Sequence, residues 1–215
     1  MYKIIEIKKK FDIEVELLEK FKRVIGILLI LVGVGIIGTV AYKKIVTSQK
    51  QNELLEAFES QLAEDNNDED NAEEEANFDS INGYTPIAII EIPSIKLKQP
   101  VVEGITEDVI KYFLGKFPDS TMPGEVGNFA VAGHRVSDFT DAFINLYKVK
   151  PGDNVIVTTK SGKYTYEVEE SFIVEPEQVE VLENADYEKI TLITCTIGSK
   201  RRVIVTGRLI EKNEA

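Results

Sequence analysis

Thr191-Leu192-Ile193-Thr194-Cys195, followed after a short turn by Arg201-Arg202-Val203-Ile204-Val205, is the stretch that decides how this chain folds. Apolar and β-branched residues dominate both runs, a composition typical of buried strands. Cys195 is the only cysteine of the chain and stands at the predicted end of the first strand. Such a thiol, with guanidinium groups at the start of the next strand, is either a reactive site or a buried cysteine acting as a small hydrophobe.

The composition limits the classes of site that the chain can build. Among 215 residues, the single cysteine excludes an intrachain disulfide framework and a Cys-rich zinc site. The single histidine, His134, excludes any site that needs two imidazoles. A formal net charge of −12 argues against a nucleic-acid-binding surface. Any Cys/His pair in this chain is therefore Cys195 with His134.

Val24 to Tyr42 is a run of 19 residues without a charged side chain. As a helix it spans about 28 Å, close to the hydrocarbon core of a bilayer. A signal peptide is the alternative, but its apolar core is usually shorter and is followed by an Ala-x-Ala cleavage site. Here Tyr42-Lys43-Lys44 follows the apolar run. We therefore expect an uncleaved transmembrane anchor at 24–42.

Basic residues are more numerous before this anchor than after it. The positive-inside rule therefore predicts a single-pass protein of the cell membrane, with segment 1–23 in the cytoplasm and everything after Tyr42 outside the cell. The basic residues before the anchor are Lys3, Lys8, Lys9, Lys10, Lys20, Lys22 and Arg23, and those shortly after it are Lys43, Lys44 and Lys50.

Segment 43–81 is predicted to be an extracellular spacer. Its first part, 47–63, has the periodicity of a helix with one apolar stripe. This helix extends the anchor, coils with a partner, or is a marginal solvated helix, and we favour the last interpretation. The stripe consists of Leu54, Leu55, Phe58 and Leu62.

The second part of the spacer, 64–79, carries nine acidic residues, four asparagines and no basic residue. Such a run cannot bury enough apolar surface to fold, so we expect it to be disordered. Its like charges repel and extend the chain, which would hold the following domain away from an anionic membrane. It lacks the Asp-x-Asp-x-Asp-Gly pattern of a calcium loop.

The composition becomes globular from residue 82, and 82–215 is the predicted outer domain. About eight short strands in some 130 residues favour a closed or nearly closed β-barrel over a parallel α/β sheet, which needs long helices between strands. We expect strands at 84–93, 95–103, 128–132, 154–159, 164–169, 171–174, 190–194 and 203–210. Short helical segments are expected at 107–113, after Thr106 as N-cap, and at 138–146, after Ser137 or Asp138.

His134 ends one predicted strand, as Cys195 ends another. A lone histidine is more often structural, but three features favour a site. Gly133 frees the backbone before it for a close approach. Arg135 after it is poorly suited to a core, and an idle free thiol in an exported domain is open to oxidation.

These motifs resemble those of the sortases, the cysteine transpeptidases of Gram-positive bacterial surfaces. The resemblance rests on Ala132-Gly133-His134-Arg135, on Thr191-Leu192-Ile193-Thr194-Cys195 and on the Arg-Val-Ile-Val strand, which occur in the family's order. The opening Ile-Glu-Ile-Pro-Ser-Ile, the run 122–128 and the N-terminal anchor resemble the family as well. The resemblance covers about 84–210 and implies a mainly β fold, an eight-stranded closed sortase-type barrel.

The resemblance also implies an activity. Sortases recognise an LPxTG-like sorting signal at the C-terminus of secreted proteins. Cys195 would attack the Thr carbonyl as a thiolate, release the Gly-bearing fragment and hold a thioacyl intermediate. His134 would protonate the departing amine and then deprotonate the incoming one, usually an amine of a peptidoglycan precursor.

An arginine would donate N–H groups to the oxyanion or to the substrate backbone. Arg201 and Arg202 would point to opposite faces of a strand, and the consecutive apolar residues after them do not distinguish the two. The family pattern Arg-x-x-Val-x-Gly fits Arg202 to Gly207, so we choose Arg202. Thr194 either lines the groove beside Cys195 or is simply a strand-forming residue.

The subclass predicted is an anchoring enzyme of the class A or class D kind. Pilus-building sortases usually carry an N-terminal lid with an Asp-Pro-aromatic element and often a second membrane span, and we find neither. Six residues between Cys195 and Arg202 leave no room for a large insertion. We predict no cofactor. Calcium activation is not carried over, because nothing marks the acidic residues near Glu103 and Glu107 as ligands.

Two other functions fit the same residues. A membrane-tethered cysteine hydrolase would use the same pair, but an added amine would change neither its product nor its rate. A non-enzymatic surface scaffold would keep its function after Cys195→Ala.

Overall fold

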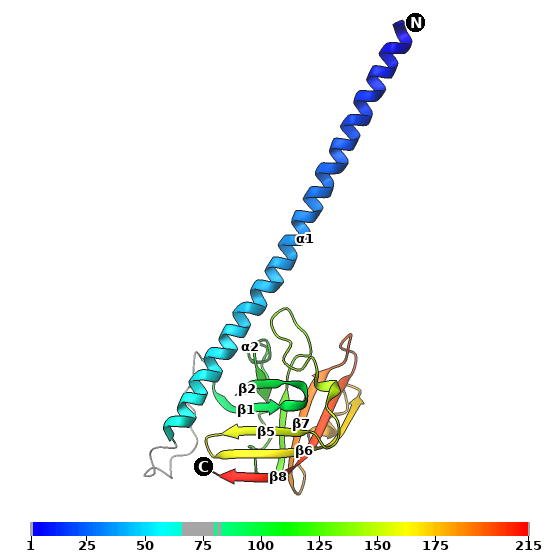
Figure 1. The fold of residues 1–215 in the computed structure, drawn as a ribbon. Coiled ribbons are helices and arrows are strands. Elements are labelled where there is room, and N and C mark those ends of the chain that lie inside the picture. The colour runs from blue at the N-terminus through cyan, green and yellow to red at the C-terminus, as the bar shows by residue number, and fades with distance from the viewer. Residues whose placement is uncertain (1, 66–79, 81–82, 215) are drawn as a thin grey trace. The chain divides into compact units, whose positions relative to one another are not determined.

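The computed structural model describes residues 2–65, 80 and 83–214. The chain divides into two compact units, Met1–Lys43 and Lys44–Ala215. Helix α1 (Tyr2–Asp65) forms the first unit and begins the second, which also contains a β-barrel (Figure 1). From residue 66 on, the segment expected to be disordered lies outside the described residues.

The described part of α1 includes one stretch that is long and apolar enough to cross a membrane. Its apolar side chains are exposed, with Ile30 at 66% and Ile37 at 70% of their full accessibility. A signal sequence near an N-terminus can meet the same criteria of length and hydropathy, so the helix is consistent with either.

The second unit contains the predicted closed barrel, in which eight strands follow the order β1-β2-β3-β4-β7-β8-β6-β5. Two neighbouring pairs, β2 with β3 and β4 with β7, are parallel, and the other pairs are antiparallel. The strands are β1 (Pro86–Ile92), β2 (Leu97–Glu103), β3 (Leu114–Lys116), β4 (Gly127–Ala132), β5 (Asn154–Thr159), β6 (Gly162–Val174), β7 (Glu188–Cys195) and β8 (Arg202–Glu214).

Alternate strand residues fill the interior of the barrel. Ile90, Val131 and Leu192, from three different strands, are fully buried in one hydrophobic cluster. The pleat of each strand places their neighbours in sequence on the outer face. On β7, the outer face therefore carries Ile193 and Cys195.

The short helical elements differ in part from the expected ones. Helix α2 (Glu107–Ile110) follows Thr106 as expected. No helix forms over 138–145, and only a 3-10 turn, η2 (Leu146–Lys148), follows. The Ser137 hydroxyl oxygen accepts the N–H groups of Phe139 and Thr140, and such local bonds compete with a helix. Two more 3-10 turns are η1 (Pro93–Ile95) and η3 (Val179–Leu182).

The expectation of a solvated helix over 47–63 is wrong. The apolar stripe lies where the periodicity puts it, but Leu54 and Phe58 are only 2% and 0% exposed. Leu54 packs in a small cluster with Val102 of β2 and Phe113 near β3. Lys98 of β2 pairs with Glu59 at 2.7 Å. The C-terminal part of α1 is therefore packed on the barrel wall.

Tyr166, fully buried in the core, makes the unfolding free energy depend on pH at alkaline values. Its hydroxyl oxygen accepts the N–H of Gly124 at 2.8 Å, and burial raises its pKa from 10.0 to about 12. Below pH 10 the phenol is neutral in both states. As the pH rises from 10 to 12, the unfolded chain loses this proton first, so the folded state loses about 2–3 kcal/mol of stability.

The Tyr166→Phe variant lacks this titration. We expect the difference in unfolding free energy between wild type and variant to shrink by about 2–3 kcal/mol as the pH rises from 10 to 12. Chemical denaturation at several pH values measures this difference. If the unfolding free energies of wild type and variant differ by the same amount at pH 10 and at pH 12, burial does not raise the pKa of this phenol.

Candidate active site

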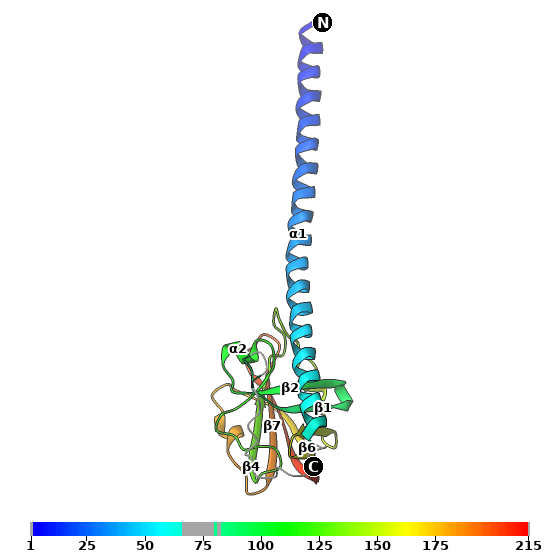
Figure 2. The ribbon, with the colours of Figure 1, turned by 90° about the vertical axis from the view of Figure 1, so that its left-hand side faces the viewer.

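Parallel pairing of β4 with β7 brings two candidate residues together. The register matches Ala132 with Ile193, and the N–H of Gly133 donates to the Ile193 carbonyl at 3.1 Å. Continued for two residues, this register places His134 beside Cys195, on chain segments that in a sheet lie about 4.8 Å apart. Figure 2 shows β4 and β7 side by side in the barrel wall. Both candidates are half-buried, so each keeps a face open to solvent.

Gly133 is required by packing within the barrel. A Cβ atom at this position would lie 2.4 Å from Leu114 Cδ2 and 2.8 Å from Phe143 Cδ2. The sequence suggested the approach of a ligand or another chain before His134, but the atoms that approach this position are core side chains of the barrel. This packing determines where the backbone leaves β4, one residue before His134.

Thr194 links the two strands behind the thiol. It is 3% exposed, and its hydroxyl donates to the Gly133 carbonyl at 2.8 Å. Neither sequence-based interpretation, a groove-lining residue or a simple strand former, included this bond. The bond ties the residue before Cys195 to the residue before His134, so Thr194 helps to set the spacing of the pair.

The Thr194→Val variant tests this link. Valine keeps the shape but leaves a buried carbonyl without its donor, which costs about 1–3 kcal/mol of unfolding free energy. Thr194→Ser keeps the hydroxyl and serves as the matched control, with a smaller loss. Denaturation of both variants measures the difference, and equal losses would show that the hydroxyl bond contributes nothing.

The two candidate arginines occupy different positions. β8 begins at Arg202, which pairs directly with Cys195, and directly opposite residues share one face of a sheet. The Arg202 guanidinium donates to the carbonyls of Ser199 and Arg201 at 3.3 and 3.4 Å. Arg201 is exposed in the preceding turn, where its N–H donates to the Thr196 hydroxyl at 3.1 Å.

Asn128, near the opposite end of β4 from His134, is a structural residue that sequence reasoning did not single out. It is fully buried, and its side-chain N–H group donates to the carbonyls of Val181 and Glu183 at 3.2 and 3.3 Å. Its side-chain oxygen accepts the Thr191 hydroxyl at 2.8 Å, and its backbone N–H donates to Asn184 at 3.1 Å. These bonds hold the β6–β7 connection over the outer face of β4 and β7. The sequence feature that could have indicated this structural role is an amide side chain within an otherwise apolar strand.

A cavity of about 340 Å³ opens beside His134. Exposed apolar side chains stand two residues beyond each member of the pair, with Val136 at 52% and Ile197 at 81% exposure. Exposed apolar groups of this kind are suited to an extended peptide. The other residues that line the cavity are Glu107, Asp108, Lys111, Ser137, Asp138 and Phe139.

Within the described ranges, no three His, Cys, Asp or Glu side chains come together in a way that would hold a metal ion. Of the acidic residues noted in the sequence, Glu103 pairs with the buried Lys116 at 3.4 Å. Glu107 and Asp108 line the cavity beside His134.

A thiol, an imidazole and a guanidinium thus stand at the ends of three neighbouring strands. A thiol and an imidazole form the nucleophile and base of a cysteine-dependent acyl transfer. A guanidinium supplies fixed donors for the oxyanion that such a transfer creates. This combination on a closed mixed barrel defines a class of cysteine acyl-transfer proteins.

Comparison with known proteins agrees with this class. A family model described as "Sortase domain" matches residues 90–210. Sortase A of Bacillus anthracis is 29% identical over 203 residues, which cover 89% of this chain and 96% of that protein. Sortase D of Bacillus subtilis strain 168 is also 29% identical over 203 residues, with 88% and 99% covered.

Solved structures give the same result. A Clostridium perfringens sortase D5 transpeptidase is 32% identical, with a TM-score of 0.59, covering 79% of this chain and 99% of that chain. Sortase E of Streptomyces avermitilis is 31% identical, with a TM-score of 0.56, covering 60% of this chain and 90% of that chain. The chain belongs to the sortase family of cysteine transpeptidases.

Proposed function

We propose that this protein cleaves an LPxTG-like sorting signal between Thr and Gly and transfers the Thr carbonyl to an amine of a cell-wall precursor. Its clients would be secreted proteins with that signal at the C-terminus. Cys195 is the nucleophile, His134 the general acid and base, and Arg202 the donor to the oxyanion or substrate backbone.

The first half-reaction forms a thioester. The Cys195 thiolate attacks the Thr carbonyl carbon, and the carbonyl oxygen takes up negative charge. The Arg202 N–H groups donate to that oxygen or to the backbone beside it. The C–N bond to Gly then breaks, and protonated His134 gives its proton to the departing amine.

The second half-reaction restores the enzyme. The incoming amine attacks the thioester carbonyl, neutral His134 takes up the proton that the amine loses, and a new amide bond replaces the C–S bond. Cys195 is released as the thiolate that began the reaction. The two half-reactions therefore balance without an oxidant or a metal.

One observation carries the proposal: the sheet register that pairs Cys195 with Arg202 and that, continued two residues beyond Ala132 and Ile193, would bring His134 beside Cys195. Arg201 lies outside this arrangement, because it is exposed in the turn before the strand. Membership of the sortase family supports both the peptide substrate and the transfer to an amine.

The proposed location follows from the N-terminal helix. We propose that 24–42 crosses the cell membrane once, with residues 1–23 in the cytoplasm and the barrel outside. The exposed apolar side chains of this stretch support the membrane crossing. The excess of basic residues before it supports the orientation.

The test is turnover of a peptide library by the full-length protein in detergent micelles, read by mass spectrometry with and without an added amine. We expect peptides with an LPxTG-like signal to be cut after Thr and joined to the amine. A product that is a free acid regardless of the amine would identify a hydrolase. An untouched library would contradict the proposed substrate.

A further inference from the structure

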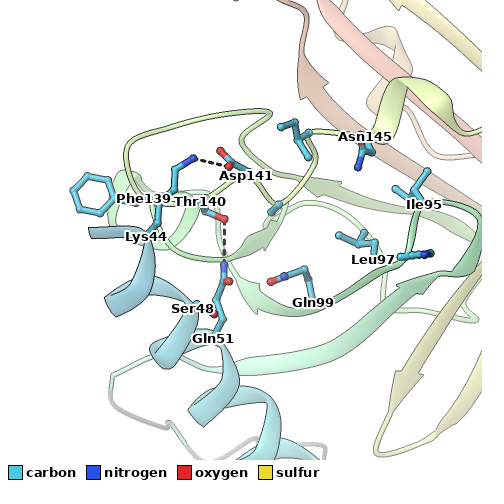
Figure 3. A pocket seen from close by; sticks show the side chains of 13 residues that line it. Lys44, Ser48, Gln51, Ile95, Leu97, Gln99, Phe139, Thr140, Asp141 and Asn145 are labelled. Atoms are coloured by element: carbon cyan, nitrogen blue, oxygen red, sulfur yellow. Dashed lines mark hydrogen bonds and ion pairs between the residues drawn. The ribbon is translucent and has the colours of Figure 1, made fainter. Parts of the chain in front are cut away.

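The part of α1 that follows the anchor contacts the loop that carries His134. Lys44 Nζ lies 2.5 Å from Asp141 Oδ2, and Gln51 Nε2 donates to the Thr140 hydroxyl at 3.2 Å. Figure 3 shows both interactions, with the helix on one side and the loop on the other. Gln51 Nε2 also donates to the Tyr112 carbonyl. The helix is thus bonded to the loop at two successive residues.

The contacted residues are connected to His134 by short hydrogen-bonded steps. The N–H of Phe143 donates to the His134 carbonyl at 3.0 Å, and Phe143 is fully buried in the core. The N–H of Ser137 donates to the Thr140 carbonyl at 2.9 Å, which closes a turn between them. The position of this turn therefore constrains the backbone that follows His134.

On the side of the turn that faces the helix, part of the space is not filled by side chains. A cavity of about 320 Å³ lies there, lined by Lys44, Gln51, Gln99 and Asp141 among others. Gln99 Oε1 and Asp141 Oδ1 are buried, and within the described residues neither has a hydrogen-bond partner. The Phe139 ring packs against Tyr112 at 5.6 Å and Thr140 is buried, so the bonds from the helix locate the turn together with these contacts.

We propose that Lys44 and Gln51 are positioning residues that hold the 137–141 turn, and through it the imidazole of His134, in its place beside Cys195. The proposal rests on the proposed function in so far as His134 is the acid and base. Leu54 and Phe58 keep the helix docked by burial, independently of the two polar contacts. A misplaced catalytic group slows a reaction steeply, by up to about 100-fold for 1 Å.

The imidazole itself is the first readout, because His134 is the only histidine. Full-length protein labelled with carbon-13 histidine, in detergent micelles, should give one imidazole resonance. We expect Lys44→Gln and Gln51→Ala to shift or broaden it. Asn52→Asp makes the same charge change as Lys44→Gln at an exposed position of the same helix, and should leave the resonance unchanged.

Turnover is the second readout. We expect Lys44→Gln and Gln51→Ala each to lower kcat by about tenfold, with KM within about twofold because the peptide contacts other residues. Lys44→Arg keeps the ion pair and should behave as wild type. The exchanged pair Lys44→Asp with Asp141→Lys should recover most of the kcat that either single change loses.

The outcomes separate this proposal from the proposed function. A resonance and a kcat that both stay at wild-type values in Lys44→Gln and Gln51→Ala would overturn the positioning role. A lowered unfolding temperature with an unmoved resonance would overturn it as well, since it would reveal packing alone. If the wild type turns over no peptide but the resonance still moves, positioning stands and the proposed substrate fails.

Discussion

Replacing Cys195 by alanine is expected to stop the reaction, with a loss of transpeptidation of about 10⁴-fold or more. The variant has no other thiol to take over the attack, because the chain contains a single cysteine. The side chain is half-buried at a strand end, so removing its sulfur leaves little empty space and the barrel should remain folded. Peptide turnover by wild type and variant measures the loss.

The same residue allows a titration on the unmodified chain. One equivalent of iodoacetamide should abolish activity in proportion to the carbamidomethyl group found on Cys195, since no other cysteine competes for the reagent. Thr196→Ala, the next residue along the chain, is the control and should leave alkylation intact. Turnover that survives complete alkylation, or that Cys195→Ala retains, would exclude the thiol as nucleophile.

Replacing Arg202 by alanine should lower kcat/KM by about 10²–10³-fold, the usual effect of removing an oxyanion donor. Arg202 pairs directly with Cys195, so its guanidinium starts from the same face of the sheet as the thiol. Lysine should restore little activity, because a single ammonium does not reproduce the planar fork of donors. Steady-state kinetics of Arg202→Ala and Arg202→Lys measure both effects.

Arg201→Ala is the matched control for this prediction. The two residues are adjacent and identical in type, but Arg201 is exposed in the turn before β8. Its loss should change kcat/KM by less than about threefold, the effect of removing an exposed charge. A large loss in Arg201→Ala with a small one in Arg202→Ala would reverse the assignment.

Sequence patterns predicted most of the barrel. The central parts of β7 and β8, 190–194 and 203–206, are rich in β-branched and apolar residues, and most of these residues are buried. β3 was missed, because Leu114–Lys116 is too short to have a periodicity and depends on pairing with distant β2 and β4. The closed order of the strands likewise depends on long-range pairing.

Two helical expectations failed for different reasons. At 138–145 the amphipathic pattern is present, but side-chain bonds of Ser137 and burial of Phe143 hold the chain in turns. In the first part of the spacer the helix and its apolar stripe were predicted correctly. The docking of this helix was not predicted, because the periodicity of Leu54 and Phe58 identifies the apolar face of the helix but not the surface against which that face packs.

The candidate site was found by elimination and by motif. A chain with one cysteine and one histidine offers only Cys195 and His134 as a pair. The choice of Arg202 over Arg201 rested on the family pattern Arg-x-x-Val-x-Gly, because consecutive apolar residues do not reveal the register of β8. The supporting contacts of Thr194 and Asn128 were also out of reach, because their hydrogen-bond partners lie on other strands and loops.

The most direct test of this account is the mass of the intact protein during turnover of an LPxTG-like peptide. We predict an adduct equal to the part of the peptide up to Thr, attached to Cys195 and sensitive to hydroxylamine as a thioester is. On addition of an amine the adduct should disappear and the ligated peptide should form. Cleavage without an adduct, or an adduct at another residue, would contradict a thioacyl-enzyme on Cys195.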